Sequence, residues 1–355
     1  MNIYSVVMAG GGGTRFWPVS RHTRPKQVLN LSGSDVMIND TIRRNSSLIP
    51  VENTYIVTNK DQEKVLKQVL FKGVNDNNIL LEPVGRNTAA CIGLAALVIN
   101  KRHGESIMCI FPSDAYISKN HEYLSVLELA CNHSRESDYF ITLGIKPSYP
   151  ATGYGYIKHS KSNYSYGIYH VEEFVEKPDP QRAVTYIQDG NYLWNSGILV
   201  CRTDTVLKAI EELLPYLYKD LMKLEQYIDT DKQDVMLEEI YPKMQSISID
   251  YGVLEKSSRV LVIPSDIGWS DVGSWDAIGT LISPTREGNI VRADHIGIDT
   301  KDTIVYGDKL IATIGVSDLI IVNTEDALLV CHKSRAQDVK GIVDQLKAKN
   351  RTDYI

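Results

Sequence analysis

Residues 3–27 read IYSVVMAGGGGTRFWPVSRHTRPKQ, and this stretch decides how the rest of the chain is organised. The run from Ile3 to Ala9 is short, rich in β-branched residues and stopped by glycine, which predicts a buried strand. The four glycines that follow let the backbone adopt positive φ and let a ligand approach the amides without a Cβ in the way. Successive N–H groups in such a loop form a concave site for an anion.

Four cations follow the glycines at once: Arg15, Arg21, Arg24 and Lys26. We expect them to join the amides around one anion, because guanidinium forks match phosphate oxygens and lysine supplies a mobile point charge. A triphosphate suits such a surface. Two other phosphate-binding loops are excluded by spacing, since a Walker loop would end in Gly-Lys-Ser/Thr and a dinucleotide fingerprint starting at Gly10 would need glycine where Arg15 stands.

The whole string Ala-Gly-Gly-x-Gly-Thr-Arg-x-Trp-Pro-x-Ser-Arg, followed by Pro-Lys-Gln, resembles the signature of the sugar-phosphate nucleotidyltransferases. Its Trp-Pro and Pro-Lys-Gln variant is most similar to the members that transfer a guanylyl group to mannose 1-phosphate. The resemblance implies catalytic roles for Arg15 and Lys26. It also implies nucleotide contacts from Ala9, Gly10, Gly11, Gly13, Thr14, Arg15 and Lys26.

Length and composition indicate an ordinary globular protein. At 355 residues, with 43% hydrophobic and 23% charged residues, the chain can form about two domains. Its net charge of -6 argues against a nucleic-acid partner, which would require many excess cations. The five scattered cysteines suggest free thiols in a reducing compartment. We see no signal peptide and no apolar run of the ~20 residues that span a membrane, so we expect a cytoplasmic protein.

Apolar strands alternate with helices along the first half of the chain. Strands are expected at 53–58, 79–81, 107–111 and 139–143, with a small-residue helix at 88–98 and shorter strands near 156–157 and 174–175. This order predicts an α/β fold with a doubly wound, mostly parallel, Rossmann-like sheet whose ligands gather at the carboxyl ends of the strands. A stripe of leucines from 204 to 227 predicts one long helix.

The residue pattern changes near 283–286, which predicts a domain boundary there. The resemblance implies that residues 1–284 form a nucleotidyltransferase domain, and residues 285–355 then form a small second domain. Short β-branched runs separated by turn residues indicate an all-β unit. No clean hexapeptide period is visible, so a left-handed β-helix-like fold is implied by the resemblance alone. Residues 334–349 have the apolar spacing of an amphipathic helix.

The segment from Glu82 to Ala90 joins a strand to a helix and, by itself, favours a plain connection. It also resembles the family's nucleotide-base segment, which implies nucleotide contacts from Glu82, Arg86, Asn87 and Thr88. Guanine suits these residues, because its N1–H and N2–H₂ edge seeks a carboxylate such as Glu82. Arg86 and Asn87 could serve the O6 and N7 side, and the sequence leaves open which residue bonds which atom.

Asp114 ends a predicted strand, and Asp271 lies within Gly-Trp-Ser-Asp-Val-Gly-Ser-Trp. A lone aspartate in such a place is usually a cap or a loop residue. The resemblance implies instead that each holds Mg²⁺, which prefers one or two carboxylates plus substrate phosphates, and that Asp114 also belongs to the nucleotide site. One residue departs from the family pattern, because Ala115 stands where a histidine is usual.

Three further motifs resemble the family's sugar-phosphate segments: Thr-Gly-Tyr-Gly-Tyr at 152–156, Val-Glu-Lys-Pro at 175–178 and Trp-Asn-Ser-Gly at 194–197. They imply a sugar-phosphate site. Its expected residues are Gly153, Tyr154, Gly155, Glu176, Lys177 and Asn195. Lys177 would hold the phosphate and is therefore also expected to be catalytic.

Together these resemblances imply transfer of GMP from GTP to α-D-mannose 1-phosphate, with release of pyrophosphate. The expected partners are GTP, mannose 1-phosphate and a second copy of the chain in a homodimer. The attacking phosphate has a second pKa of about 6, so it is already ionised and no general base is required. We expect no isomerase activity. Two alternatives stay open: transfer to another sugar 1-phosphate, and a catalytically silent regulatory subunit that senses a nucleotide sugar.

Overall fold

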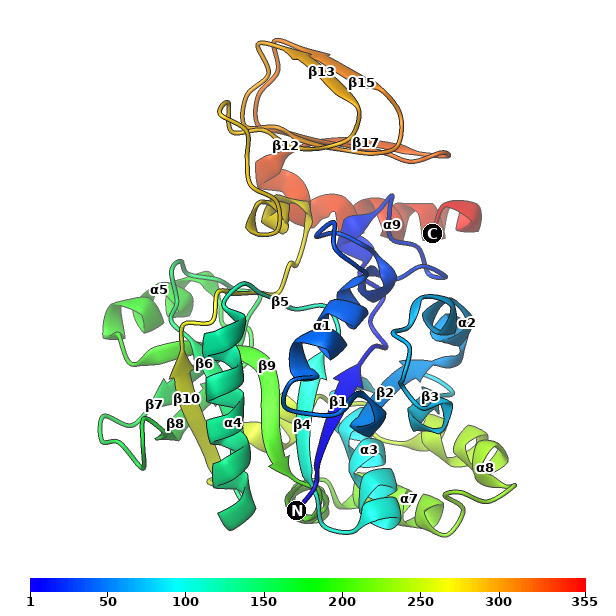
Figure 1. The fold of residues 1–355 in the computed structure, drawn as a ribbon, viewed down its shortest axis with the longest axis vertical. Coiled ribbons are helices and arrows are strands. Elements are labelled where there is room, and N and C mark those ends of the chain that lie inside the picture. Colours follow the sequence, from blue (N-terminus) through cyan, green and yellow to red (C-terminus); the bar gives the residue numbers. More distant parts are fainter.

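The computed structural model describes all 355 residues, and its largest element is a nine-stranded sheet in the order β3-β2-β1-β4-β9-β6-β10-β8-β7 (Figure 1). Its strands are β1 (Ile3–Met8), β2 (Thr54–Asn59), β3 (Ile79–Glu82), β4 (Ile107–Pro112), β6 (Phe140–Ile145), β7 (Tyr156–His159), β8 (Tyr169–Val175), β9 (Tyr192–Arg202) and β10 (Val260–Ser265).

The half of the sheet that contains β1 is entirely parallel, whereas in the other half only β6 and β10 pair in parallel. In the first half, Val6 pairs with Tyr55 of β2 on one side and with Ile110 of β4 on the other, both in parallel register. β9 then inserts antiparallel to both β4 and β6, so the other half is mixed rather than mostly parallel. The carboxyl ends of β1 and β4 therefore meet at one edge, as in other doubly wound sheets.

Helices cover both faces of the sheet. α3 (Asn87–His103), α6 (Thr203–Leu213), α7 (Pro215–Glu225) and α8 (Gln233–Ile240) share one apolar core with it, while α4 (Asn120–Glu136) and α5 (Pro180–Asp189) share another on the opposite face. The expected single helix over 204–227 is wrong. Pro215 has no N–H and forces Leu214 out of helical geometry, so α6 ends there and α7 begins.

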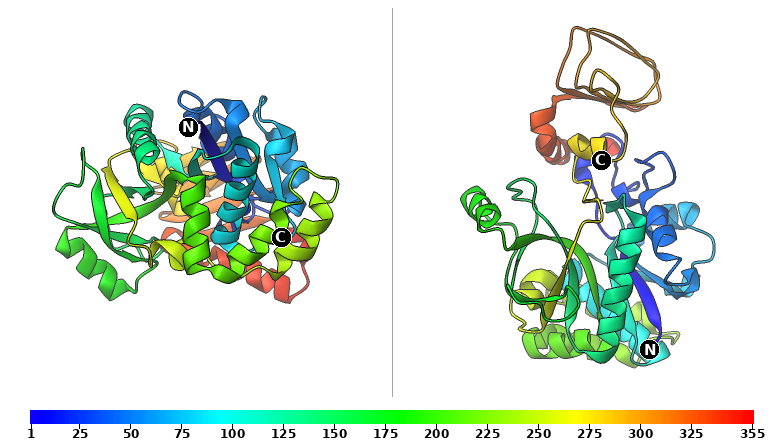
Figure 2. Two further views of the ribbon diagram at one scale, coloured as in Figure 1. Left: turned by 90° about the horizontal axis from the view of Figure 1, so that it is seen from below. Right: turned by 60° about the vertical axis from the view of Figure 1, so that its left-hand side comes forward.

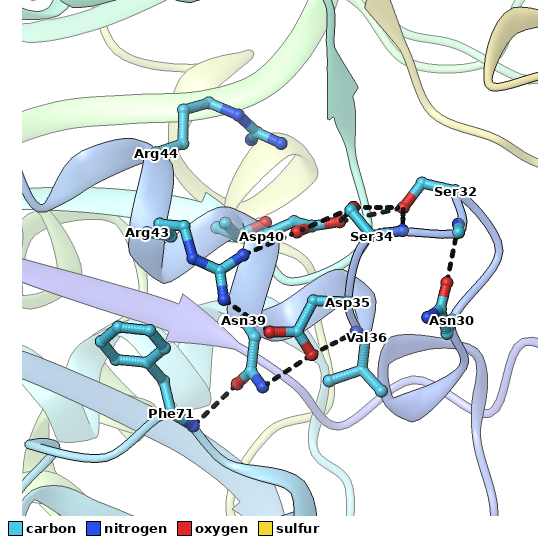
Figure 3. Close-up of polar contacts among 12 residues, drawn as sticks. Asn30, Ser32, Ser34, Asp35, Val36, Asn39, Asp40, Arg43, Arg44 and Phe71 are labelled. Carbon is cyan, nitrogen blue, oxygen red and sulfur yellow. Dashed lines mark hydrogen bonds and ion pairs between the residues drawn. The ribbon is translucent and has the colours of Figure 1, made fainter.

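Near the glycine loop, α1 (Met37–Asn45) and α2 (Lys60–Val69) pack beside β1 and β2. Polar side chains fix the chain before α1, as Figure 3 shows. Asp35 Oδ1 accepts hydrogen bonds from Val36 N and Asn39 Nδ2, and Asn39 Oδ1 in turn accepts from Phe71 N beyond α2. These bonds join the start of α1 to the chain just after α2.

The C-terminal unit is a stack of short strands. β12 (Ile290–Arg292), β14 (Ile304–Tyr306), β16 (Leu319–Asn323) and β17 (Leu328–His332) form one sheet, and β13 (His295–Ile298) pairs in parallel with β15 (Ile311–Ile314) in another. The unit forms the orange coil at the top of the right-hand view in Figure 2. The expected all-β character is confirmed. The helix expected from 334 begins later, because a 3-10 helix occupies Lys333–Asp338 before α9 (Val339–Ala348).

One apolar cluster joins this unit to the glycine loop. Phe16 and Trp17, which follow the glycines after Thr14 and Arg15, share it with Ile304 of the β unit and with Val339 and Val343 of α9. The Trp17 indole N–H donates to the Tyr354 carbonyl at 2.7 Å. α9 therefore lies between the β unit and the loop, as Figure 1 shows.

All five cysteines are free thiols, as their scattered positions suggest. None of the helices combines the length and the apolar character that a bilayer span requires.

Candidate active site

The glycine loop turns its carbonyl groups inward and its amides outward. Gln27 Nε2 donates to the carbonyls of Ala9 and Gly11 at 2.7 and 3.1 Å, and Thr58 Oγ1 donates to Ala9 at 3.0 Å. The N–H groups of residues 10–13 donate to no acceptor within the protein. Four consecutive donors without a protein partner are what the predicted anion site requires, and anion binding there stays a prediction.

Gly13 is the position in the loop where the backbone conformation requires a residue without a side chain. Its φ is +59°, and a Cβ built there would lie 2.2 Å from the Cβ of Lys26. Any other residue would be strained and would collide. Gly13 therefore allows Lys26 to pack directly against the loop.

Lys26 brings the two predicted metal ligands together. Its Nζ lies 2.9 Å from Asp114 Oδ2, 3.1 Å from the Asp114 carbonyl and 2.7 Å from the Asp271 carbonyl. The side chain is only 5% exposed. A short antiparallel pair, β5 (Tyr116–Ile117) with β11 (Trp269–Ser270), aligns the two segments from which these aspartates come.

Two of the four expected cations turn away. Arg21 donates to Asp326 of the C-terminal unit at 2.9 Å. Arg21 thus faces the C-terminal unit, because the chain after Phe16 is anchored in the shared apolar cluster. Arg24, which forms a backbone bridge with Arg21, is exposed.

A cavity of about 370 Å³, here called the phosphate cavity, opens beside the glycine loop. Its lining contains no apolar side chain. The lining residues are Gly13, Thr14, Arg15, Lys26, Asp114, Asp271, Gly273 and Lys340. The structure thus brings together the expected Gly13, Thr14, Arg15, Lys26 and both aspartates. Lys340, from α9, is a residue that the sequence reasoning missed.

A second cavity of about 260 Å³, here called the sugar cavity, adjoins the carboxyl ends of β1 and β4. Five of the six expected sugar-phosphate residues line it: Gly153, Tyr154, Gly155, Glu176 and Asn195. Thr88 lines it too, although the sequence places Thr88 with the nucleotide. Asp271 lines both cavities, so the two spaces meet at this carboxylate.

Hydrogen bonds order the sugar cavity. The Tyr154 hydroxyl donates to Asp271 Oδ1 at 2.7 Å. Asn195 Oδ1 accepts from Thr142 Oγ1 at 3.0 Å, and its Nδ2 donates to Asp250 Oδ1 at 3.1 Å. Asp250 begins a π-helical turn, a feature common at functional sites, and the sequence did not single out its side chain. Burial, helped by the charge of Glu176, raises the pKa of Asp250 to about 6.

Lys177 lies beside this cavity, with Nζ 2.6 Å from Glu176 Oε1 and a side chain that is 59% exposed. Burial by itself would lower the pKa of Lys177, but the hydrogen bond and charge of Glu176, together with Asp250, raise it. The ammonium is therefore held in its charged form beside the expected position of the sugar phosphate.

The remaining base-segment residues line neither cavity. Glu82 is buried beneath Gly10, where burial raises its pKa and its Oε1 accepts a hydrogen bond from the Tyr241 hydroxyl. Asn87, at φ 64°, is exposed, and its Oδ1 accepts from Thr88 N at 2.8 Å. The buried Nε of Arg86 has no partner. Their contacts with guanine stay predictions.

The aspartates fit a hard divalent cation. Lys26 engages one oxygen of Asp114, and Tyr154 engages one oxygen of Asp271, so each carboxylate keeps one oxygen without a protein partner. No group of three or more His, Cys, Asp or Glu side chains is arranged to hold a metal ion. A pair of carboxylates completed by phosphate oxygens is the arrangement typical of Mg²⁺, and much less so of zinc.

Comparisons with known proteins find relatives along nearly the whole chain. Residues 4–287 match the family model described as "Nucleotidyl transferase", and residues 293–346 match a "MannoseP isomerase/GMP-like beta-helix domain". The chain is 36% identical to a mannose-1-phosphate guanylyltransferase of Escherichia coli K12, over 99% of this chain and 75% of the relative. It is 37% identical to the mannose-1-phosphate guanylyltransferase RfbM of Salmonella typhimurium, over 100% and 74%.

A solved structure from Thermus thermophilus, described as a mannose-1-phosphate geranyltransferase, superposes with a TM-score of 0.88 at 34% identity. The match covers 98% of this chain and all of that one. The likeness thus extends through both the large sheet and the C-terminal unit. The chain belongs to the nucleotidyl transferase family and, within it, to the group of the mannose-1-phosphate guanylyltransferases.

Proposed function

We propose that this chain transfers a guanylyl group from GTP to α-D-mannose 1-phosphate, forming GDP-mannose and pyrophosphate. The observation that carries the proposal is the position of Asp271, which lines both the phosphate cavity and the sugar cavity and is tied to Asp114 through Lys26. Two phosphorylated substrates bound in these cavities would meet at the paired aspartates. The names of the relatives identify the substrates in this proposal.

The reaction is an in-line displacement at the α-phosphorus of GTP. An oxygen of the sugar phosphate forms the new P–O bond, the bond to the β-phosphate breaks, and pyrophosphate leaves with that electron pair. Because the attacking phosphate is already ionised, the chain needs to orient it rather than deprotonate it. Lys177 and Glu176 would hold the sugar phosphate, while the glycine-loop amides and Arg15 would bind the outer phosphates of GTP.

Mg²⁺ is the proposed metal, held by the uncommitted oxygens of Asp114 and Asp271. Bound there, it would offset phosphate charge and hold the two substrates in register. Lys26 keeps the two aspartates adjacent, and the Tyr154 hydroxyl orients Asp271.

A pyrophosphate-release assay tests the function. The purified chain is mixed with each of the four nucleoside triphosphates and with a panel of hexose 1-phosphates, with and without Mg²⁺. We expect release only with GTP and mannose 1-phosphate, and only with the metal. Release with another pair would contradict the proposed substrates. Absence of turnover combined with GDP-mannose binding would instead indicate a regulatory subunit.

We also propose that the chain acts as a homodimer in the cytoplasm. Supporting a dimer, Ile296, Ile298 and Ile314 are 61%, 56% and 71% exposed on the paired strands β13 and β15. Five unpaired thiols suit a reducing compartment. Light scattering should give twice the chain mass, and a monomer mass at micromolar concentration would contradict the dimer; cell fractionation checks the location.

A further inference from the structure

Lys340 belongs to α9 in the C-terminal unit, yet it lines the phosphate cavity together with Arg15 and Lys26. Its side chain is exposed. The carboxylate nearest to it in sequence, that of Asp338, pairs with Arg335 instead. A charged side chain that faces a cavity without a protein counter-ion is available to a ligand of opposite charge.

Lys340 matters more for a phosphate ligand because the N–H groups of Lys26 are already used by the protein. An ammonium group has three N–H donors, and three oxygens already surround the Lys26 Nζ: the two aspartate carbonyls and Asp114 Oδ2. Lys26 can still contribute positive charge, but it keeps no free N–H for a phosphate. Arg15 and Lys340 are therefore the cations in this lining with donors to spare.

Packing of the neighbouring residues fixes the backbone of Lys340 beside the phosphate cavity. The next residue toward the N-terminus, Val339, is buried with Val343 in the apolar cluster that also contains Phe16 of the glycine loop. Gln337 Nε2 donates to Ser274 Oγ at 2.6 Å, three residues beyond Asp271. The start of α9 is thus joined to both walls of the phosphate cavity.

We propose that Lys340 binds the β- and γ-phosphates of GTP and, after transfer, the departing pyrophosphate. This inference rests on the function proposed above. The cavity gathers three cations around two carboxylates, and a bound metal would add further positive charge, so the polyanionic outer phosphates are the ligand that neutralises the site. The C-terminal unit would then complete the active site of its own chain instead of serving only for packing or assembly.

The test compares Lys340→Ala and Lys340→Arg with Lys347→Ala, an exposed lysine at the far end of the same helix. Calorimetry measures the binding of inorganic pyrophosphate and of GDP-mannose to each full-length protein. Kinetics give kcat/KM for GTP. GDP-mannose is the discriminating ligand, because it lacks the outer two phosphates of GTP and should not reach Lys340.

We expect Lys340→Ala to weaken pyrophosphate binding and to lower kcat/KM for GTP by at least about tenfold, the effect of one charged hydrogen bond. Lys340→Arg should keep most of the wild-type pyrophosphate affinity and kcat/KM for GTP, and Lys347→Ala should match wild type in both. GDP-mannose affinity should change less than about twofold. Unaltered pyrophosphate binding, or an equal loss of GDP-mannose binding, would overturn the inference. Pyrophosphate binding also reports on Lys340 if wild type proves inactive with GTP, an outcome that would defeat the proposed function alone.

Discussion

Replacing Lys26 with methionine should destabilise the fold as well as abolish turnover. Methionine keeps the length of the side chain but removes the ammonium that bridges Asp114 and Asp271 at 2.9, 3.1 and 2.7 Å. The side chain is only 5% exposed, so water cannot replace the lost donors. The sequence alone would assign Lys26 purely to phosphate binding and would predict little change in stability.

The size of the loss follows from these contacts. Hydrogen bonds from a charged donor contribute about 1.5–3 kcal/mol each, and breaking a buried charge pair costs about 3–5 kcal/mol. The Asp114 side chain is 36% exposed, so solvent screens its part of the interaction. The added apolar contacts of methionine offset a further fraction. We therefore expect the free energy of unfolding to fall by about 2–4 kcal/mol.

Urea titration, followed by tryptophan fluorescence and circular dichroism, measures this loss. Arg15→Met is the matched control, because Arg15 lines the same cavity but is exposed and makes no hydrogen bond or ion pair within the chain. It should lose at least about tenfold in kcat while unfolding at the wild-type midpoint. An unfolding free energy for Lys26→Met within about 0.5 kcal/mol of wild type would refute the bridging role.

Three further outcomes are expected. Gly13→Ala should lose about 2 kcal/mol or more in thermal or urea unfolding through strain and collision with Lys26, whereas Gly11→Ala, with open space around its Cβ, should stay within about 0.5 kcal/mol. Asp271→Asn should reduce Mg²⁺-dependent turnover at least about tenfold with an unchanged melting temperature, and wild-type rates would point to other metal ligands. Because the pKa of Asp250 is about 6 in the folded chain against an ordinary 3.8, the folded state holds its proton longer, and ionisation costs stability as pH rises from about 4 to 6. Asp250→Asn should therefore gain about 2 kcal/mol over wild type at pH 7 but not at pH 4, and equal urea midpoints at pH 7 would contradict this.

Local rules made the strands next to the glycine loop predictable. The apolar run ending at Ala9 forms β1, and residues 107–111 form β4, because short β-branched runs stopped by glycine or proline have few other stable conformations. The same rules failed where a single residue interrupts a pattern. The leucine stripe continues through 214–215, but proline cannot continue the helix, so periodicity predicted one helix where two exist.

The order and direction of the strands in the sheet were harder to predict from the sequence. Nothing in the run of Tyr192–Arg202 indicates that β9 inserts antiparallel between β4 and β6, because the composition of a strand that is covered on both faces does not reveal its direction. β13 is hard to predict for a similar reason. His-Ile-Gly-Ile is too short and too broken by glycine to be recognised without its partner β15.

By itself, the sequence predicted the backbone freedom of the glycine loop, because that freedom is a property of residues and of short spacings. The two aspartates were predicted only through the resemblance to a known family. Only the tertiary structure decided which cations line the phosphate cavity. Arg21 turns to Asp326, Lys26 gives its donors to two loops 88 and 245 residues away, and Lys340 arrives from the last α-helix. Each of these outcomes depends on charge partners brought together by packing, and no local pattern encodes such a meeting.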